Sequence, residues 1–579
     1  MLARLFSRVF PTWQNALLAV LGAVLLILAF PDFDWWFLAW FALVPLMWAV
    51  EREKESTLRS FVTGWLFGTV FFFGTCWWLT FAPINYAGFP WWLAYFLLLC
   101  VCLVVGLFPA MFAGILSILH RRFGLSAIFA APIVWVFTEF LRYWLTGNNW
   151  NAIGYSQSSN SALGWAPIGG VLLVSFVVGF YNLVALAFVL NAVDFVSKRL
   201  GLSNKFVESP LEEKQGDEST MFREIGDGTD DDLSPFLVGG LLAVSIIYMW
   251  MTTPNYSPSD GAESFVVAVQ PNVPMDGSTF KSLDSLRDRH VELSNDAFTA
   301  NLERMVQQKV DADTGGESRG THDEYSAILR SRYAKAPKLV VFPESPMNFA
   351  YNDDREFQHF IGDFARRNSV SVLFNSAEPD AGTTKYFNSA VMVGPDGKEA
   401  AQYDKIYLLP FGEAVPRPLE GILPGFVGNF AYGREYDILP VGDAKAGVMI
   451  CFESHFGALS REYVRNGADV LIEMTNDGYL GPTPVLRQHL ANAVFRAVET
   501  NRPVLRVTNV GITAYINERG QVLDEAPSYQ EATRVWSVSK SDGSQTFYVK
   551  YGDWFAWLCT IVTIGLLGAC ILRRKQDEA

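Results

Sequence analysis

The chain reads Gly447-Val448-Met449-Ile450-Cys451-Phe452-Glu453-Ser454 near the end of a long polar segment. The apolar, partly β-branched run is typical of a buried strand, and the polar residues after it lead to an expected helix over 456–465. A thiol at such a strand-to-helix turn lies near free backbone N–H groups, which favour a thiolate and a nearby oxyanion. A lone cysteine in an apolar run is more often structural. Two motifs upstream favour a reactive thiol instead.

Composition places this polar segment within a membrane protein. The chain has 579 residues, and its apolar stretches gather at its two ends. A net charge of −14 without a basic stripe argues against a nucleic-acid partner. The cysteine spacing fits no zinc site. Of the six cysteines, only Cys451 lies outside the apolar runs, so the polar segment cannot form an internal disulfide.

Eight apolar runs are long enough, or nearly so, to cross a hydrocarbon layer of about 30 Å. They lie at 16–30, 35–50, 61–81, 91–119, 126–145, 171–196, 236–251 and 555–572. If every run crosses, the Lys and Arg clusters beside them all fall on one side, which is expected to be cytoplasmic. Both termini are then cytoplasmic, and the polar segment lies on the outer side.

Three regions follow from this count. Residues 1–251 hold seven transmembrane helices, with a cytoplasmic loop at 198–235. Residues 252–553 form an outer domain, and 554–579 hold the eighth helix and a cytoplasmic tail. The acidic stretch 208–234 has too few large apolar residues to offset its chain entropy and is expected to be a mobile loop. The stretch 311–324 is expected to be a surface insertion.

The outer domain alternates apolar runs with amphipathic stretches, which indicates an α/β fold with a strand-rich end typical of a sandwich. Strands are expected at 264–270, 339–342, 371–374, 389–393, 446–450, 470–473, 503–507, 513–516 and 535–538. Helices are expected at 283–308, 354–367 and 485–500.

Three polar side chains come after such runs, where strand ends present them to a cleft. They are Glu344, Lys405 and Cys451. With a reference pKa near 8.5, a free thiol is only a few per cent ionised at neutral pH, so it needs a base. A carboxylate can take the proton, and an ammonium can hold the oxyanion of a tetrahedral intermediate. Alone, Glu344 is more often a helix cap and Lys405 a surface lysine.

In order and approximate spacing, these stretches resemble the Glu–Lys–Cys triad of the nitrilase (carbon–nitrogen hydrolase) superfamily. That resemblance implies a four-layer αββα sandwich. Eight spans with such a domain between the seventh and eighth resemble the bacterial apolipoprotein N-acyltransferase family over essentially the whole chain. Local matches are Gly154-Tyr155-Ser156-Gln157 in an outer loop, 410–413, 475–477, 502–503 and 508–513.

The resemblance implies a role for each matched residue. Glu344 is the general base, Lys405 the oxyanion stabiliser and Cys451 the nucleophile. Glu413 matches a second glutamate that the family needs, and Glu453 matches the acid two places after the cysteine.

The chain departs from the family pattern at two places. Phe452 follows the nucleophile where the family has Tyr, so the ring is kept and the hydroxyl is lost. A tryptophan expected soon after Pro274 is missing, and Phe280 is the nearest aromatic candidate. Both changes indicate tuning of the site. Tyr155, in the matched outer-loop segment, is a further candidate for substrate binding.

The implied reaction is a two-step acyl transfer that needs neither a cofactor nor a metal. Cys451 takes an acyl chain from a phospholipid, expected to be phosphatidylethanolamine at its sn-1 position. The α-amine of the S-diacylglyceryl-cysteine at a lipoprotein's N-terminus then accepts it. The expected location is the bacterial inner membrane, with the catalytic domain in the periplasm.

Two other functions agree with part of this pattern. A membrane-tethered amidase would use the same triad with water as the second nucleophile, but eight spans exceed what a tether needs. A transporter or scaffold would not need the triad. Its ion path would also require more intramembrane charges than Glu139 and Arg142, which lie near a span end.

Overall fold

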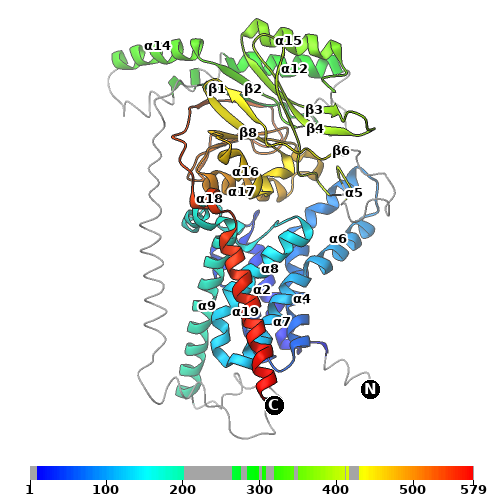
Figure 1. Cartoon of the computed structure of the whole chain (residues 1–579), viewed down its shortest axis with the longest axis vertical. Helices are drawn as coiled ribbons and strands as arrows, with labels where there is room; N and C mark the ends of the chain where they lie inside the picture. Colours follow the sequence, from blue (N-terminus) through cyan, green and yellow to red (C-terminus); the bar gives the residue numbers. More distant parts are fainter. Residues whose placement is uncertain are drawn as a thin grey trace. The chain divides into compact units, whose positions relative to one another are not determined.

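The computed structural model describes residues 9–200, 264–275, 283–298, 303–304, 306–307, 319–344, 350–410, 412–415 and 430–577 (Figure 1). Its contacts divide the chain into two compact units. We call Met1–Asn255 with Asp553–Ala579 the helical unit, and Tyr256–Gly552 the sheet unit. The predicted span at 236–251, the acidic stretch 208–234 and Phe280 lie outside the described residues. The predicted domain limits at 252 and 553 remain predictions.

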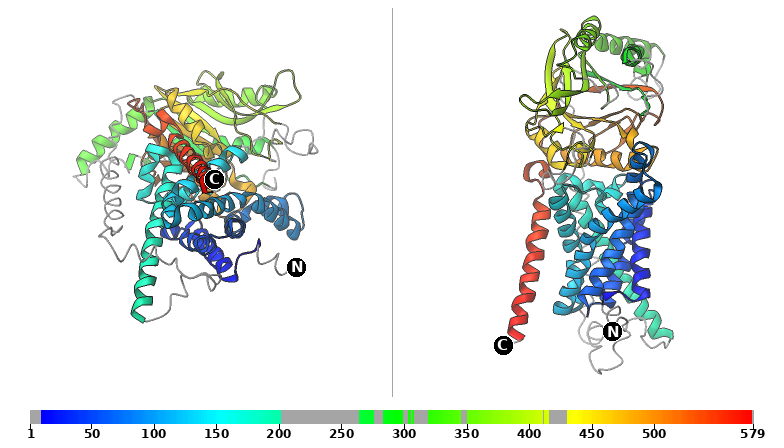
Figure 2. Two further views of the ribbon diagram at one scale, coloured as in Figure 1. Left: turned by 60° about the horizontal axis from the view of Figure 1, so that its bottom comes forward. Right: turned by 90° about the vertical axis from the view of Figure 1, so that its right-hand side faces the viewer.

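The helical unit is built from apolar helices that lie side by side (Figure 2). Its described helices are α2 (Trp13–Ala29), η1 (Trp36–Trp40), α3 (Val44–Arg52), α4 (Thr57–Thr75), η2 (Trp77–Thr80), α5 (Phe81–Asn85), α6 (Trp91–Val105), α7 (Leu107–Phe123), η3 (Gly124–Ala130), α8 (Ala131–Thr146), η4 (Ile153–Gln157), η5 (Ser161–Trp165), α9 (Ala166–Leu200) and α19 (Trp554–Asp577).

By length and composition, four described segments can cross a membrane: Trp91–Phe123, Ser126–Thr146, Ser161–Val189 and Trp554–Leu572. A fifth results if Thr57–Thr75 and Trp77–Asn85, which meet at a 61° bend, count as one span. The 17-residue α2 falls short of this length. The predicted count of eight is therefore not reached among the described residues.

The expected span at 35–50 is wrong as one continuous helix. The chain forms the short η1 and then starts again at α3, with Pro45 in the first turn. Proline has no backbone N–H to donate to the preceding turn, but it fits the start of a helix. Hydropathy alone does not reveal this break, because both pieces are apolar.

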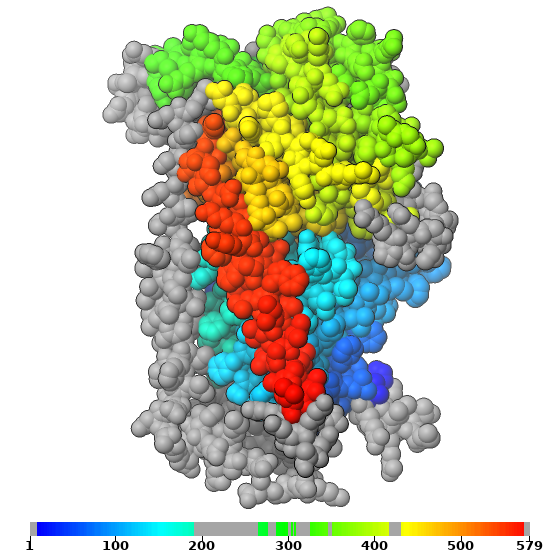
Figure 3. Space-filling model, viewed as in Figure 1, coloured from blue at the N-terminus to red at the C-terminus, as the bar shows by residue number. Residues whose placement is uncertain are grey.

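Small residues let neighbouring helices of this unit approach closely. A Cβ on Gly64 of α4 would lie 2.4 Å from the carbonyl oxygen of Pro109 in α7. Any larger residue at position 64 would push the two helices apart. By contrast, α19 lies along the outside of the unit (Figure 3), and only 22% of its apolar membrane-length stretch is buried. Its exposed apolar face suits contact with lipid.

The sheet unit contains two sheets. The first has the order β13-β1-β2-β3-β4-β5, with β6 paired to β4, and the second has the order β12-β11-β10-β9-β8-β7. The first is formed by β1 (Ser264–Gln270), β2 (Lys338–Val341), β3 (Ser371–Pro379), β4 (Tyr386–Val393), β5 (Glu399–Asp404), β6 (Phe430–Ala431) and β13 (Ala532–Val538). The second is formed by β7 (Ile438–Val441), β8 (Ala444–Ile450), β9 (Val470–Thr475), β10 (Val504–Thr508), β11 (Ala514–Ile516) and β12 (Val522–Leu523).

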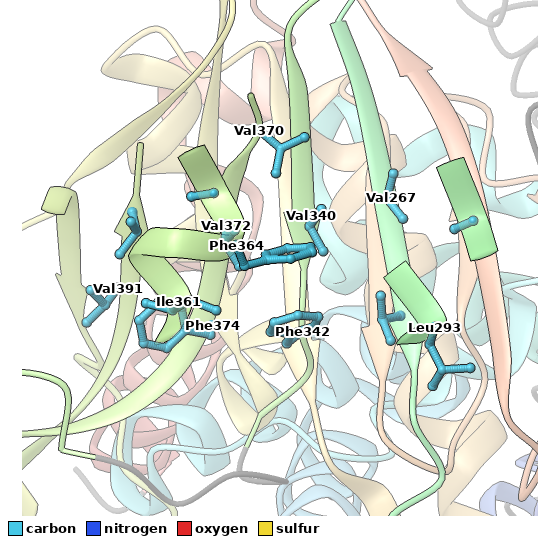
Figure 4. Close-up of a cluster of buried hydrophobic side chains, with 14 of the residues drawn as sticks. Val267, Leu293, Val340, Phe342, Ile361, Phe364, Val370, Val372, Phe374 and Val391 are labelled. Atoms are coloured by element: carbon cyan, nitrogen blue, oxygen red, sulfur yellow. The ribbon is translucent and has the colours of Figure 1, made fainter. Parts of the chain in front are cut away.

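Helices cover the outer face of each sheet. On the first sheet, α12 (Leu283–Asp296) and α15 (Arg355–Asn368) bury their apolar sides against β1 to β4, as the core in Figure 4 shows. On the second, α16 (Gly457–Arg465) and α17 (Val485–Thr500) contact β8 and β10, while β10 also contacts β1 of the first sheet. The order is helix, sheet, sheet, helix, which confirms the nitrilase-like domain that the resemblance implied.

The sequence pattern explains α15 well. The Asp354 side chain accepts a hydrogen bond from the backbone N–H of Phe357 and caps the helix. Phe357, Ile361 and Phe364 follow at helical spacing and are buried in the core. After the helix, Ser369 adopts a left-handed conformation with φ of 52° and ends it.

All nine expected strands occur; the strand at 264–270 has the expected bounds, and the others have shifted ends. The prediction missed β5 because it is polar, and β6, β7 and β12 because they are very short. The single helix expected over 283–308 is described as α12 for Leu283–Asp296. In the surface insertion expected at 311–324, residues 319–324 begin the helix α14 (Arg319–Lys335).

Candidate active site

The ends of three strands of the sheet unit carry the predicted triad. Glu344 follows β2, Lys405 is the first residue after β5, and Cys451 is the first residue after β8. Lys405 Nζ lies 3.4 Å from Glu344 Oε1. The charges of both side chains act on the Cys451 thiol. Strands far apart in the sequence thus bring the acid, the ammonium and the thiol into one site.

Cys451 adopts a strained backbone conformation. Its φ is +53°, in the left-handed region, which costs a non-glycine residue about 1–3 kcal/mol. The 3-10 turn η8 (Cys451–His455) begins at this residue and precedes α16. The thiol therefore lies in a 3-10 turn between the strand and the helix, and not at the direct strand-to-helix junction that was predicted. The strand before it is held by a hydrogen bond of 2.6 Å from the Tyr463 hydroxyl to the Val448 carbonyl. Neighbouring contacts therefore fix the direction of the thiol.

Four side chains, three of them buried and Glu413 half-buried, form what we call the lysine cluster. It consists of Glu344, Asn388, Lys405 and Glu413. Lys405 Nζ lies 2.8 Å from Glu413 Oε1, closer than to Glu344. Asn388 Nδ2 donates to Glu413 Oε1 at 2.6 Å and to Glu344 Oε1 at 3.2 Å. The predicted Glu413 is thus in the site, next to both the lysine and the proposed base.

Sequence reasoning missed Asn388. Besides bridging the two glutamates, its backbone carbonyl accepts a hydrogen bond of 2.8 Å from the backbone N–H of Lys405. Its signal was weak, because an asparagine at the start of an apolar strand is commonly read as part of a turn. Only the pairing of β4 with β5 places it beside the lysine.

The charges in the lysine cluster set the protonation states of the site. Burial alone would lower the pKa of Lys405, but Glu413 and Glu344 outweigh it and raise this pKa above its usual value. Burial and the charge of Glu344 raise the pKa of the Cys451 thiol well above its usual value, against the opposing effects of Lys405 and a hydrogen bond with Thr475. Burial and Glu344 thus outweigh the groups that favour a thiolate in the free site. The sulfur rests as a neutral thiol, and attack requires a base.

Glu453 joins the nucleophile turn to the segment that carries the lysine. Its Oε2 accepts a hydrogen bond from the backbone N–H of Ile450 at 2.9 Å. Its Oε1 accepts from the backbone N–H of Ile406 at 2.8 Å and from the Tyr403 hydroxyl at 2.8 Å. This fully buried carboxylate holds the residue before Cys451 and the residue after Lys405 in one register, so it positions the reacting groups.

Phe452 packs its ring inside the turn. The ring centroid lies 4.8 Å from that of His455 and 5.3 Å from that of Phe456. The side chain is 7% exposed. The ring therefore serves as packing behind the nucleophile, a role that does not depend on the hydroxyl that the family residue would carry.

A second charged set, which is buried and which we call the ion quartet, also lies beside Cys451. It consists of Glu473 in β9, Asp477 in η9 (Asp477–Leu480), His489 in α17 and Arg506 in β10. Arg506 lies 2.6 Å from Glu473 Oε2 and 2.8 Å from Asp477 Oδ2. Sequence reasoning missed the quartet, although Glu473 and Arg506 interrupt strands that are otherwise apolar. Charges in such strands are almost always paired when buried.

Two predicted residues lie outside the described part of the sheet unit. Tyr155 lies in η4 of the helical unit and is buried, with its backbone N–H donating to the Ala152 carbonyl at 2.9 Å. The segment is thus a buried 3-10 turn, which the buried Glu139 holds by accepting a hydrogen bond of 2.7 Å from the backbone N–H of Ile153. Phe280 lies outside the described residues. In the described part of the chain, no cluster of His, Cys, Asp and Glu has a geometry that could hold a metal ion.

The sequence matches known proteins along most of the chain. Residues 22–184 match the family model "Apolipoprotein N-acyltransferase N-terminal domain", and residues 272–546 match "Carbon-nitrogen hydrolase". An apolipoprotein N-acyltransferase of Geobacter metallireducens is 29% identical over 97% of this chain and 96% of its own. One of Thermotoga maritima is 27% identical over 97% of this chain and 95% of its own. Among solved structures, an amidase of the nitrilase superfamily from Nesterenkonia is 16% identical and covers 51% of this chain and 95% of its own, with a TM-score of 0.33.

Proposed function

The chain belongs to the apolipoprotein N-acyltransferase family, and from this premise we propose that it transfers an acyl chain from a membrane phospholipid to the N-terminal amine of lipoproteins. The observation that carries the proposal is the lysine cluster beside Cys451, which places two carboxylates and one ammonium next to a neutral thiol. The relatives of that name extend over nearly the whole chain, membrane part included.

In the first step, Glu344 takes the proton of the Cys451 thiol as the sulfur attacks the ester carbonyl of the phospholipid. The new carbon–sulfur bond converts the carbonyl into a tetrahedral oxyanion, which the Lys405 ammonium stabilises. The carbon–oxygen ester bond then breaks. The leaving alkoxide takes the proton back from Glu344 and departs as a lysophospholipid, leaving a thioester on Cys451.

In the second step, the α-amine of the lipoprotein's diacylglyceryl-cysteine attacks the thioester. Glu344 takes a proton from the attacking nitrogen, Lys405 again holds the oxyanion, and the carbon–sulfur bond breaks. The proton on Glu344 then returns to the sulfur, so the enzyme is restored and the lipoprotein carries a new amide. Glu413, bound to Lys405, keeps the ammonium in place through both steps.

Both substrates are held in a membrane, and this explains why the enzyme has a helical unit. A site tethered at the bilayer keeps two sparingly soluble substrates within reach. We assign phosphatidylethanolamine as the donor, with the acyl chain taken from its sn-1 position. We assign the protein to the bacterial inner membrane. The Lys and Arg distribution supports a catalytic domain on the periplasmic side and two cytoplasmic termini.

The orientation is tested by labelling cysteines from outside spheroplasts with an impermeant maleimide. A cysteine replacing the exposed Tyr386 of the sheet unit should react at once. A cysteine replacing Glu55, beside the basic residues at 52–59, should react only after the membrane is permeabilised. The unaltered chain gives the background from its own cysteines. Labelling of the Glu55→Cys chain from outside would contradict this orientation.

The acyl-enzyme decides between transfer and hydrolysis. Purified protein given phospholipid alone should gain one acyl chain on Cys451, visible by mass spectrometry and removable by neutral hydroxylamine. The Cys451→Ala chain should gain none. A diacylglyceryl-cysteine peptide should discharge the thioester, with ping-pong kinetics overall. Continuous release of fatty acid without transfer to the peptide would instead favour a membrane-tethered amidase or hydrolase.

A further inference from the structure

The ion quartet contacts Cys451 through the backbone carbonyl of that residue. His489 Nε2 lies 3.1 Å from the carbonyl oxygen of Cys451 and 3.0 Å from Ser454 Oγ. The same nitrogen is 3.1 Å from Glu473 Oε1. Across the ring, His489 Nδ1 lies 2.7 Å from Asp477 Oδ1. One histidine of α17 thus connects two carboxylates, behind the turn, to the residue that carries the reactive thiol.

The contacts of His489 favour a doubly protonated ring. A neutral imidazole has one N–H, so one of its nitrogens would present a lone pair to a carboxylate or a carbonyl. An imidazolium donates on both sides. It also balances the charges, because Arg506 and the imidazolium then face Glu473 and Asp477. The quartet is buried, and a buried charge without a partner is costly.

The groups around His489 support this state. Burial and the charge of Arg506 lower its pKa, but Asp477 and Glu473 outweigh them and raise the pKa to about 9. A further ionisable neighbour is His455, whose ring centroid lies 5.2 Å away and whose pKa is held well below its usual value, chiefly by burial, so that ring stays neutral. The positive charge therefore resides on His489 near neutral pH.

We propose that His489 is a positioning residue for acyl transfer, and that its imidazolium holds the Cys451 carbonyl and so keeps the left-handed backbone that directs the thiol toward Glu344 and Lys405. The inference rests on the proposed function only in taking Cys451 as the nucleophile. His489 does not touch the reacting atoms. It acts through the carbonyl, where the Ser454 hydroxyl is a second donor at 3.4 Å.

The proposal predicts an unusual pH dependence of thiol reactivity. A thiol in a fixed environment reacts faster with an alkylating agent as the pH rises, because more of it becomes thiolate. In this protein, loss of the His489 proton at a pH of about 9 releases the carbonyl and lets the turn relax. The alkylation rate of Cys451 should therefore stop rising, or fall, above that pH.

The test uses the full-length chain in detergent and measures Cys451 alkylation by iodoacetamide, quantified on its own peptide by mass spectrometry. Because iodoacetamide is soluble and small, the readout does not depend on which substrate the enzyme uses. We expect His489→Gln to react about tenfold more slowly at pH 7.5 and His489→Leu more slowly still, since only glutamine keeps an N–H donor. Neither variant should show the bend near pH 9.

A second variant keeps the test decisive if the His489 variants do not fold. Asp477→Asn leaves a group of the same shape but removes one carboxylate, so the bend should move to lower pH by about one unit. Asp469→Asn is the matched control, because Asp469 lies before the opposite end of β9 and bonds Ser541 and Lys445. The control is expected to lower stability while leaving the rate and the bend unchanged.

The possible outcomes divide cleanly. A bend in the unaltered chain that shifts in Asp477→Asn and vanishes in His489→Gln supports the proposal. A rate that rises with pH without a bend in the unaltered chain overturns it. Equal losses of rate in His489→Gln and in the Asp469→Asn control would reduce the quartet to a structural role and also overturn it. Failure of acyl transfer with a normal alkylation profile would count against the proposed function alone.

Discussion

The lysine cluster and the ion quartet both lie beside Cys451 and differ in charge balance. The lysine cluster has two carboxylates for one ammonium. The quartet has two carboxylates for an arginine and an imidazolium. The excess carboxylate in the first set leaves Glu344 able to accept a proton. The balanced set has no such spare group, so it holds the backbone. The comparison suggests that charge imbalance separates a reactive set from a supporting one.

The largest expected effect is loss of the spare carboxylate in the lysine cluster. Glu344→Gln keeps the shape and the acceptor for Asn388 but removes the base, so thioester formation should slow by roughly 10²- to 10⁴-fold. The measurement is single-turnover acylation of Cys451 from phospholipid. The Cys451→Ala chain defines the signal without acylation. Glu399→Gln, on the exposed part of β5, is the matched control. Near-normal acylation by a folded Glu344→Gln chain would remove the proposed base.

Unbalancing the quartet should cost stability more than chemistry. Arg506→Met leaves two buried carboxylates facing one cation, and removing one partner of a buried pair costs about 3–5 kcal/mol in the free energy of unfolding. Denaturant unfolding of the full chain in detergent, followed by circular dichroism, measures this loss. The double variant Arg506→Met with Glu473→Gln restores the balance and should recover part of it. Equal stability of the single and double variants would show that charge balance is not what matters.

A smaller effect is expected from the second carboxylate of the lysine cluster. Glu413→Gln removes the nearer charge from Lys405, and the ammonium should then bind Glu344 and compete for the base. A hydrogen bond to a charged group contributes about 1.5–3 kcal/mol, so turnover should fall roughly ten- to a hundredfold. Turnover assays with phospholipid and a diacylglyceryl-cysteine peptide measure this. A loss as large as that of Glu344→Gln would mean that Glu413 takes part in proton transfer.

The smallest effect is expected at the ring of Phe452, the residue after the nucleophile. Phe452→Tyr adds one hydroxyl to a ring packed on His455 and Phe456, and the family accepts a tyrosine there. Activity should stay within about tenfold, or 1.4 kcal/mol in the barrier. The same turnover assay measures it, with Phe452→Leu as the variant that loses the ring. An inactive but folded Phe452→Tyr chain would show that the pocket is built around phenylalanine.

Part of the fold was predictable because its signals are local. Apolar runs marked the strands that carry Glu344 and Cys451, and the alternation of strands and helices indicated a sandwich. The span count was less secure, since a run such as 35–50 has the hydropathy of a span and yet breaks between η1 and α3, before Pro45. Hydropathy sums side chains over a window, whereas the direction of a helix depends on single residues.

By itself, the sequence determined which residue types stand at the strand ends, and so the identity of the acid, the ammonium and the thiol. Only the tertiary structure decided which other residues contact them. Asn388 lies 44 residues from Glu344, and His489 lies 38 residues from Cys451, yet each is in hydrogen-bond contact. Buried polar groups must find partners wherever the packed sheets bring one close. That choice depends on strand order and helix placement, which no local pattern of residues records.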